Sequence, residues 1–131
     1  MTTMSSEADA IVSAIIAKWC TGFGRLDAAA LSSLYAKNAF FFGSNPKLYR
    51  GRDGVADYFN GLPRWRKPSA TFSEVNAEQA GPGLINMGAT ITFDLAGERP
   101  ELVVKMSWVI IREDGDWKIV NHHASAKAPL I

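Results

Sequence analysis

Residues 112–125 read REDGDWKIVNHHAS and contain the strongest fold signal in this chain. Asp114-Gly115 separates two runs of β-prone residues, which is typical of a two-residue hairpin turn. Such a turn fixes which residues of the two strands face each other, and successive side chains then alternate between the two faces of the sheet. The register of this hairpin therefore predicts which side chains share the interior.

Pairing Glu113 with Asp116 brings three polar side chains to one inward row of the second strand. The cross-strand pairs in that row are Trp108–Asn121, Met106–His123 and Val104–Ser125. A buried polar group without a partner costs about 1–3 kcal/mol. These polar groups therefore need each other, water or a ligand, and we give a structural network and a ligand cavity equal weight.

The opposite face of the hairpin is apolar for much of its length. It holds Val103, Val109, Ile111 and Val120. A strand that is apolar on both faces is covered on both sides, and the helices of this chain can cover only one face of the sheet. We therefore expect a homodimer formed through these four residues.

Length and composition indicate one domain spanning residues 1–131. The hydrophobic fraction of 47% is that of an ordinary globular protein, and a net charge of +1 gives no reason to expect a nucleic acid or an anionic membrane as partner. Cys20 is the single cysteine, so no disulfide forms within the chain. The first residues lack signal-peptide features, and no apolar run is long enough to span a bilayer. The expected location is the cytoplasm.

Helical periodicity dominates the first half of the chain and strand alternation the second, an order that predicts the α+β class. Helices are expected from about Ser6 to Thr21, from the cap Asp27 through Tyr35, and from a cap near Asp53 to Leu62. The expected strands cover 39–42, 69–78, 84–95, 102–112 and the stretch after the hairpin turn.

Few side chains are suited to chemistry. His122 and His123 are adjacent on a strand and should point to opposite faces, so they cannot bind one metal ion, and we expect no metal site. His123 is the candidate general acid or base of the inward row. Cys20 on a helix is interpreted as inert packing.

The element order and the ending at Gly115, Trp117, Val120, His123 and Ser125 resemble the nuclear-transport-factor-2-like superfamily. The ending continues into Ala128-Pro129, and residues 51–59 resemble the family's entry into its third helix. The chain looks most like the association domain of calcium/calmodulin-dependent kinase II and the SnoaL-like bacterial proteins. This resemblance implies a cystatin-like cone, in which three helices pack on a curved, mostly antiparallel sheet and leave a pocket at the wide end.

The resemblance also limits the chemistry. Against ketosteroid isomerase, another member, the positions of the catalytic Tyr and the base Asp fall on Trp19 and Gly43, so that reaction is not expected. Two arginine positions of the kinase domain fall on Ala89 and Trp108 in a match made through Arg99-Pro100 and Asp114-Gly115, which argues against an anionic ligand.

The sequence thus favours a protein that binds a small, largely apolar molecule without a cofactor. A second reading makes it a cofactor-free isomerase, cyclase or dehydratase with His123 as catalytic residue, and the competing class is a non-catalytic association module with a vestigial pocket. The resemblance places Trp65, in the basic loop between Arg64 and Lys67, at the pocket mouth. The predicted ligand-binding residues are Trp19, Tyr58, Trp65, Met106, Trp108, Asn121 and Ser125.

Overall fold

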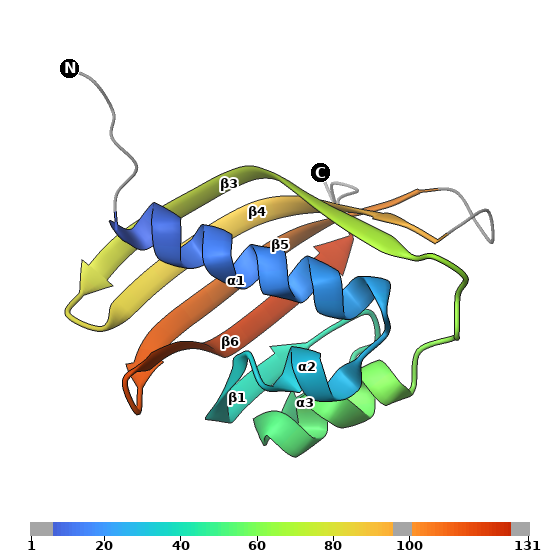
Figure 1. Ribbon diagram of the computed structural model, residues 1–131, viewed down its shortest axis with the longest axis horizontal. Helices are drawn as coiled ribbons and strands as arrows, with labels where there is room; N and C mark the ends of the chain where they lie inside the picture. Colours follow the sequence, from blue (N-terminus) through green and yellow to red (C-terminus); the bar gives the residue numbers. More distant parts are fainter. Residues whose placement is uncertain (1–6, 96–100, 127–131) are drawn as a thin grey trace.

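A computed structural model describes residues 7–95 and 101–126. Three helices lie on one face of a curved six-stranded sheet (Figure 1). The elements in chain order are α1 (Glu7–Gly24), α2 (Ala28–Ser32), β1 (Tyr35–Phe42), β2 (Leu48–Arg50), α3 (Gly51–Asn60), β3 (Ser69–Gly81), β4 (Leu84–Asp94), β5 (Leu102–Glu113) and β6 (Asp116–Ala126). The predicted α+β class is confirmed.

The strand order is β2-β1-β6-β5-β4-β3, and all neighbouring pairs are antiparallel except β1 with β6. Helix α1 lies across the sheet and packs on β3, whereas α3 packs on β1 and α2 (Figure 1). Trp19 and Phe23 on α1 stack with ring centroids 5.5 Å apart, and both are buried against the sheet. The apolar residues that recur with helical period in α1 therefore form its core-facing side.

The hairpin turn has the predicted form. Asp114 and Gly115 both have positive φ, 53° and 82°, as a type I′ turn requires. Glu113 pairs with Asp116, and Ile110 pairs with Ile119, so the first part of the predicted register is confirmed.

Beyond Ile119 the register shifts by one residue. Val109 pairs with Asn121, so Val120 has no partner in β5 and forms a β-bulge. The shift exchanges the faces of the rest of β6, because strand side chains alternate with a period of two. His122 now faces inward opposite Trp108, and the predicted pairs Trp108–Asn121, Met106–His123 and Val104–Ser125 are wrong.

Other differences concern the ends of elements. Helix α2 has its predicted cap, because Asp27 Oδ1 accepts a hydrogen bond from Ala30 N at 3.0 Å, but the helix ends at Ser32. Tyr35 consequently begins β1 rather than ending a helix. Helix α3 begins before the predicted cap Asp53, and the short strand β2 was not predicted. The expected start of the first helix, Ser6, lies outside the described residues, as do Arg99-Pro100 and Ala128-Pro129, which were used in the family comparison.

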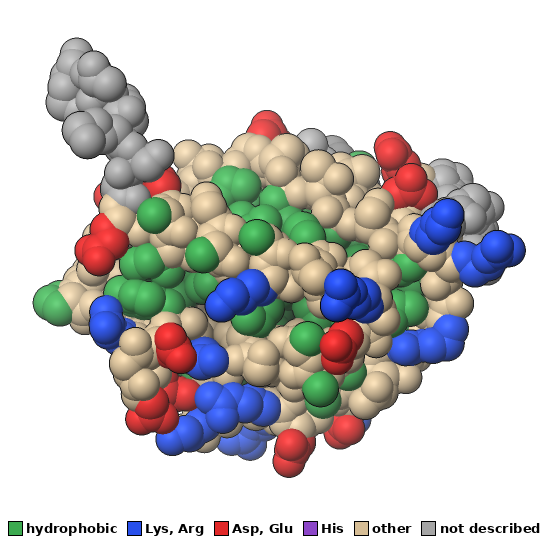
Figure 2. Space-filling model, viewed as in Figure 1, with side chains coloured by type: hydrophobic (Ala, Val, Ile, Leu, Met, Phe, Trp, Pro, Cys, Tyr) green, Lys and Arg blue, Asp and Glu red, His purple; other side chains and the backbone are tan. Residues whose placement is uncertain are grey.

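Acidic and basic side chains are interspersed on the helix-bearing face (Figure 2), in keeping with the net charge of +1. None of the helices within residues 7–95 and 101–126 is both long and apolar enough to cross a lipid bilayer.

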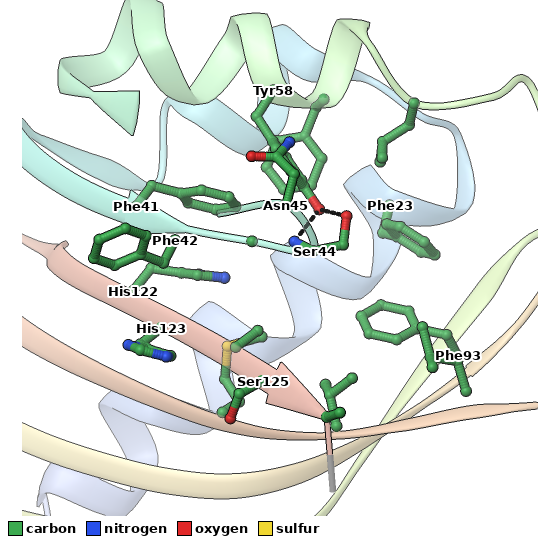
Figure 3. A pocket seen from close by; sticks show the side chains of 18 of the residues that line it. Phe23, Phe41, Phe42, Ser44, Asn45, Tyr58, Phe93, His122, His123 and Ser125 are labelled. Carbon is green, nitrogen blue, oxygen red and sulfur yellow. Dashed lines mark hydrogen bonds between the residues drawn. The ribbon is translucent and has the colours of Figure 1, made fainter. Parts of the chain in front are cut away.

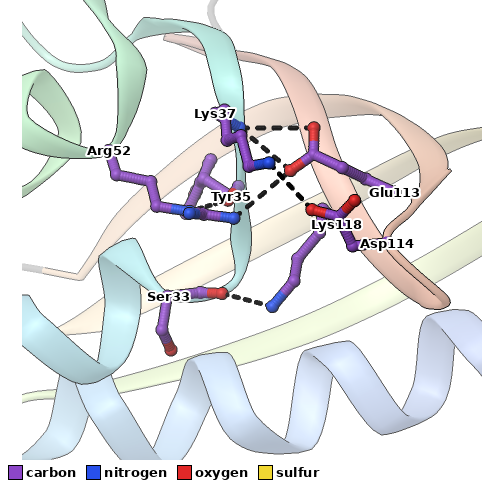
Figure 4. A network of polar contacts seen from close by, with 7 residues as sticks. All are labelled: Ser33, Tyr35, Lys37, Arg52, Glu113, Asp114 and Lys118. Carbon is purple, nitrogen blue, oxygen red and sulfur yellow. Dashed lines mark hydrogen bonds and ion pairs between the residues drawn. The ribbon is translucent and has the colours of Figure 1, made fainter.

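A polar network fastens the turn of the β5–β6 hairpin to β1 and α3 (Figure 4). Arg52 donates from Nε to the Tyr35 carbonyl at 2.9 Å and from Nη2 to Glu113 Oε1 at 3.2 Å. The same carboxylate accepts from Lys37 N at 3.2 Å. The network joins residues far apart in sequence, so it holds β1 against the hairpin. It also fixes the position of the Tyr35 backbone, from which the side chain extends into the core.

We predict that Arg52→Lys lowers the free energy of unfolding by about 1–2 kcal/mol, because an ammonium group cannot reproduce the two directed bonds of the guanidinium. Urea unfolding followed by circular dichroism measures the change. Lys37→Gln is the control, since it removes only the exposed ion pair with Asp114 and should leave the midpoint unchanged. Equal effects of the two substitutions would contradict the assigned role of Arg52.

Candidate functional site

A cavity of about 780 Å³ lies at the wide end of the molecule. It is bordered by the last turns of α1 and α3, the ends of β1 and β4, the start of β5 and the end of β6 (Figure 3). This volume is in the range of pockets that hold small organic molecules. The exposed residues Ser44 and Asn45 after β1 and Ser125 on β6 mark its mouth.

The lining is apolar and mostly aromatic. No aspartate, glutamate, lysine or arginine belongs to it within the described part of the chain. The aromatic lining residues are Trp19, Phe23, Phe41, Phe42, Tyr58, Phe59, Trp65 and Phe93. Such walls favour ligands with an apolar body and disfavour uncompensated charge.

His122 is the buried polar residue of the cavity wall, with 2% of its surface exposed. Its Nδ1 lies 2.8 Å from the Tyr35 hydroxyl and accepts from Trp108 Nε1 at 3.0 Å. The Phe41 ring stacks on the imidazole at a centroid distance of 3.9 Å. Three strands thus hold the imidazole in one orientation, and the bulge at Val120 is what turns it inward.

Burial controls the protonation of this group. Desolvation, with a smaller contribution from His123, lowers the pKa of His122 to about 3. Burial also raises the pKa of the Tyr35 hydroxyl, which stays protonated. The interior end of the cavity is therefore neutral at physiological pH.

The polar row expected from the sequence is not inside the protein. Asn121, His123 and Ser125 are exposed, and Asn121 lies outside the cavity wall. His123 and Ser125 contribute to the mouth, where the His123 ring lies 5.5 Å from that of Phe42. Figure 3 shows His122 and His123 on opposite sides of β6, as predicted, but with the inward and outward positions exchanged.

Five of the predicted ligand-binding residues line the cavity: Trp19, Tyr58, Trp65, Met106 and, at the mouth, Ser125. Trp108 does not line it and lies behind His122 with 1% exposure. Sequence reasoning missed His122 and Phe41, because no residue type near Val120 signals a bulge.

Tyr58 occupies the space next to Gly43. A Cβ at Gly43 would collide with the Tyr58 ring, whose hydroxyl donates to Ser44 Oγ at 2.9 Å and accepts from Ser44 N at 3.0 Å. A carboxylate at position 43, as in the isomerase comparison, would therefore need Tyr58 to move.

Two further residues are used structurally. Arg64, in the loop after α3, donates to the carbonyl oxygens of Leu26 and Phe59, so its guanidinium is committed to the backbone. Cys20 donates to the Ala70 carbonyl at 3.3 Å, and burial raises the pKa of its thiol. A raised pKa disfavours the nucleophilic thiolate, in agreement with the interpretation as inert packing.

A family model for the SnoaL-like domain matches residues 12–129, nearly the whole chain. The chain belongs to the SnoaL-like domain family. The resemblance to the nuclear-transport-factor-2-like superfamily, inferred from the sequence, is thereby confirmed. No curated protein matches this SnoaL-like domain in sequence.

Solved structures share the fold of this SnoaL-like domain at low sequence identity. A calcium/calmodulin-dependent protein kinase II association-domain-like protein from Xanthomonas campestris is 19% identical, with 100% of this chain and 95% of that chain covered and a TM-score of 0.83. An NTF2-like protein of unknown function from Pseudomonas putida KT2440 is 15% identical, with 98% and 92% covered and a TM-score of 0.83. A hexachlorocyclohexane dehydrochlorinase is 14% identical, with 91% and 84% covered and a TM-score of 0.75.

We predict that this SnoaL-like domain loses stability as the pH falls from about 6.5 toward 3. The unfolded chain binds a proton at His122 near its ordinary pKa of about 6.5, whereas the folded protein does so only near a pKa of about 3. The free energy of unfolding therefore decreases by about 1.4 kcal/mol for each unit by which the pH falls within this window. Above about pH 6.5 the contribution of His122 to stability is constant.

Urea unfolding from about pH 7.5 to about pH 4.5 measures this slope. His122→Gln should remove the contribution, while the matched control His123→Gln should retain it because His123 is exposed. A slope that is the same in His122→Gln as in the unmodified protein would contradict the assignment.

Proposed function

We propose that this protein binds a small, largely apolar molecule in the cavity at its wide end. The observation that carries the proposal is the cavity itself: about 780 Å³, walled by aromatic and aliphatic side chains, with one buried polar group, His122. Binding sites for small molecules combine such walls with a few convergent polar atoms. In a non-catalytic association module we would expect side chains to fill this interior instead.

The charge state of the cavity favours binding over acid–base catalysis. A general base works best with a pKa near the operating pH, and the pKa of His122, lowered to about 3 by burial, is far below it. Any proton transfer would fall to His123 at the mouth, the catalytic residue proposed from the sequence. An unchanged turnover after His123→Ala, once a substrate is known, would remove that second candidate function.

The helix-free face supports the proposed homodimer. Val103, Val109 and Ile111 alternate with the inward residues of β5, so they lie on the face opposite the helices, where each is only half-buried in the single chain. Val120, at the bulge, is also half-buried. A second copy of the chain would cover this apolar surface.

We predict that filling the cavity abolishes ligand binding without unfolding the protein. Ala124 lines the cavity opposite Met106, and Ala124→Phe should weaken binding of the neutral probe N-phenyl-1-naphthylamine at least about tenfold. Fluorescence titration measures the affinity. Ala10→Phe, on the exposed side of α1, is the matched control and should bind normally. Failure of the unmodified protein to bind any apolar probe would overturn the proposed function.

We also predict that Val109→Asp converts a dimer to a monomer, because an ionised carboxylate cannot be buried in an apolar interface without a partner. Sedimentation equilibrium over a range of concentrations gives the mass. Val75→Asp, on the edge strand β3, is the control and should leave the dimer intact. A monomer mass at every concentration of the unmodified protein would refute the homodimer.

A further inference from the structure

The hydrogen bonds of His122 determine where its proton lies. The indole N–H of Trp108 can only donate, and it points at His122 Nδ1 from 3.0 Å. Nδ1 is therefore the acceptor of this bond and carries no proton. In a neutral imidazole the proton is then on Nε2.

Tyr35 leads to the same assignment independently. Its oxygen accepts from Trp19 Nε1 at 3.0 Å and lies 2.8 Å from His122 Nδ1. Because the indole of Trp19 has no lone pair to offer, the hydroxyl proton of Tyr35 is directed to Nδ1. Two donors thus converge on one ring nitrogen, and a proton on Nδ1 would set N–H against N–H in a dry interior.

The other ring nitrogen is available to a ligand. His122 lines the cavity, and both of the side-chain hydrogen bonds that it makes to described residues are at Nδ1. No buried side-chain nitrogen or oxygen within the described residues lacks a partner, and no described side chain bonds to Nε2. Because His122 lines the cavity, we place Nε2 at the cavity surface. Figure 3 shows the ring of His122 extending from β6 into the cavity beside Phe41.

His122 Nε2–H, a single neutral donor at the inner end of the cavity, favours a ligand that carries a hydrogen-bond acceptor. A carbonyl oxygen accepts from Nε2–H and brings no proton of its own. An alcohol at the same place would also accept, but its hydroxyl proton would then face aromatic walls without a partner, which is unfavourable. A carboxylate would lose its hydration without meeting a cation in the described lining.

We propose that the cavity selects a neutral, planar or aromatic ligand with a carbonyl oxygen that accepts from His122 Nε2–H, and that Trp108 and Tyr35 together are the positioning residues that fix this tautomer. The inference rests on the proposed function, since it names the ligand class of the same cavity. The aromatic walls formed by Trp19, Phe41 and Tyr58 suit a flat apolar body, and the neutral imidazole supplies the orienting bond.

Three probes with one bicyclic skeleton test the ligand class: 1-tetralone, which carries a carbonyl, tetralin, which lacks it, and 1-tetralol, which carries a hydroxyl. In the unmodified protein we expect 1-tetralone to bind about tenfold more tightly than either of the others, as one retained hydrogen bond predicts. His122→Phe should reduce this preference to about onefold, and His122→Gln, which keeps an amide donor, should restore part of it.

Nitrogen-15 NMR of the imidazole tests the positioning role without any ligand. The unmodified protein should show an unprotonated Nδ1 and a protonated Nε2. Trp108→Phe combined with Tyr35→Phe removes both donors to Nδ1, so it should give a mixture of tautomers and lose the preference for 1-tetralone while tetralin still binds. Trp108→Phe alone should keep Nδ1 unprotonated, because Tyr35 still donates to it. The matched control Trp117→Phe, near the hairpin turn, should change neither result.

Equal affinities for 1-tetralone and tetralin in the unmodified protein, or a proton found on Nδ1, would overturn this inference and leave the proposed function standing. Should none of the three probes nor the naphthylamine probe bind, the proposed function itself would fail, and the ligand class with it.

Discussion

The bond from the Trp108 indole to His122 Nδ1 is the contact on which the interior of this protein depends. It exists because Val120 is left unpaired in β6, which turns the side chain of His122 toward the helices. Without the bulge, Asn121 and His123 would face the core, and the Trp108 N–H would meet a different partner. The bond satisfies a buried donor that no water reaches, and at the same time it leaves the other nitrogen of the imidazole free for the cavity.

The rest of the fold keeps this arrangement in place. Arg52 and Glu113 tie the hairpin to β1, and β1 brings the Tyr35 hydroxyl to His122 Nδ1 and the Phe41 ring onto the face of the imidazole. Aromatic rings from α1 and α3 also pack against one another, since Trp19 contacts Phe59 edge to face with centroids 6.0 Å apart. The interior is therefore rigid beside the cavity, and the polar group at its inner end has one orientation and one protonation state.

A shared fold does not imply a shared function. The dehydrochlorinase and the kinase association-domain-like protein share the fold with this chain at 14% and 19% identity, which establishes architecture and no more. Two features of this chain bear on its chemistry: the glycine at position 43, where Tyr58 fills the space, and the absence of charged side chains from the described cavity wall. Both features favour the binding of a neutral molecule over proton abstraction by a carboxylate.

The sequence by itself determined the class of fold, the helical periodicity of α1, the cap at Asp27 and the two-residue hairpin turn at Asp114-Gly115. These features follow from local rules: apolar periodicity, side-chain caps and the backbone angles that glycine tolerates. Five of the predicted ligand-binding residues, Trp19, Tyr58, Trp65, Met106 and Ser125, do line the cavity, and the first three were predicted from their aromatic character and place in the resembling fold.

Only the tertiary structure decided which histidine lies inside. A bulge of one residue costs little locally and leaves no mark in composition or spacing, yet it reverses the direction of every later side chain in the strand. The bulge at Val120 is compatible with contacts from outside the hairpin, because Ile119 N donates to the Leu34 carbonyl and Phe40 pairs with Asn121. Pairing with β1, which is 80 residues away in sequence, is a long-range condition that the hairpin sequence does not contain.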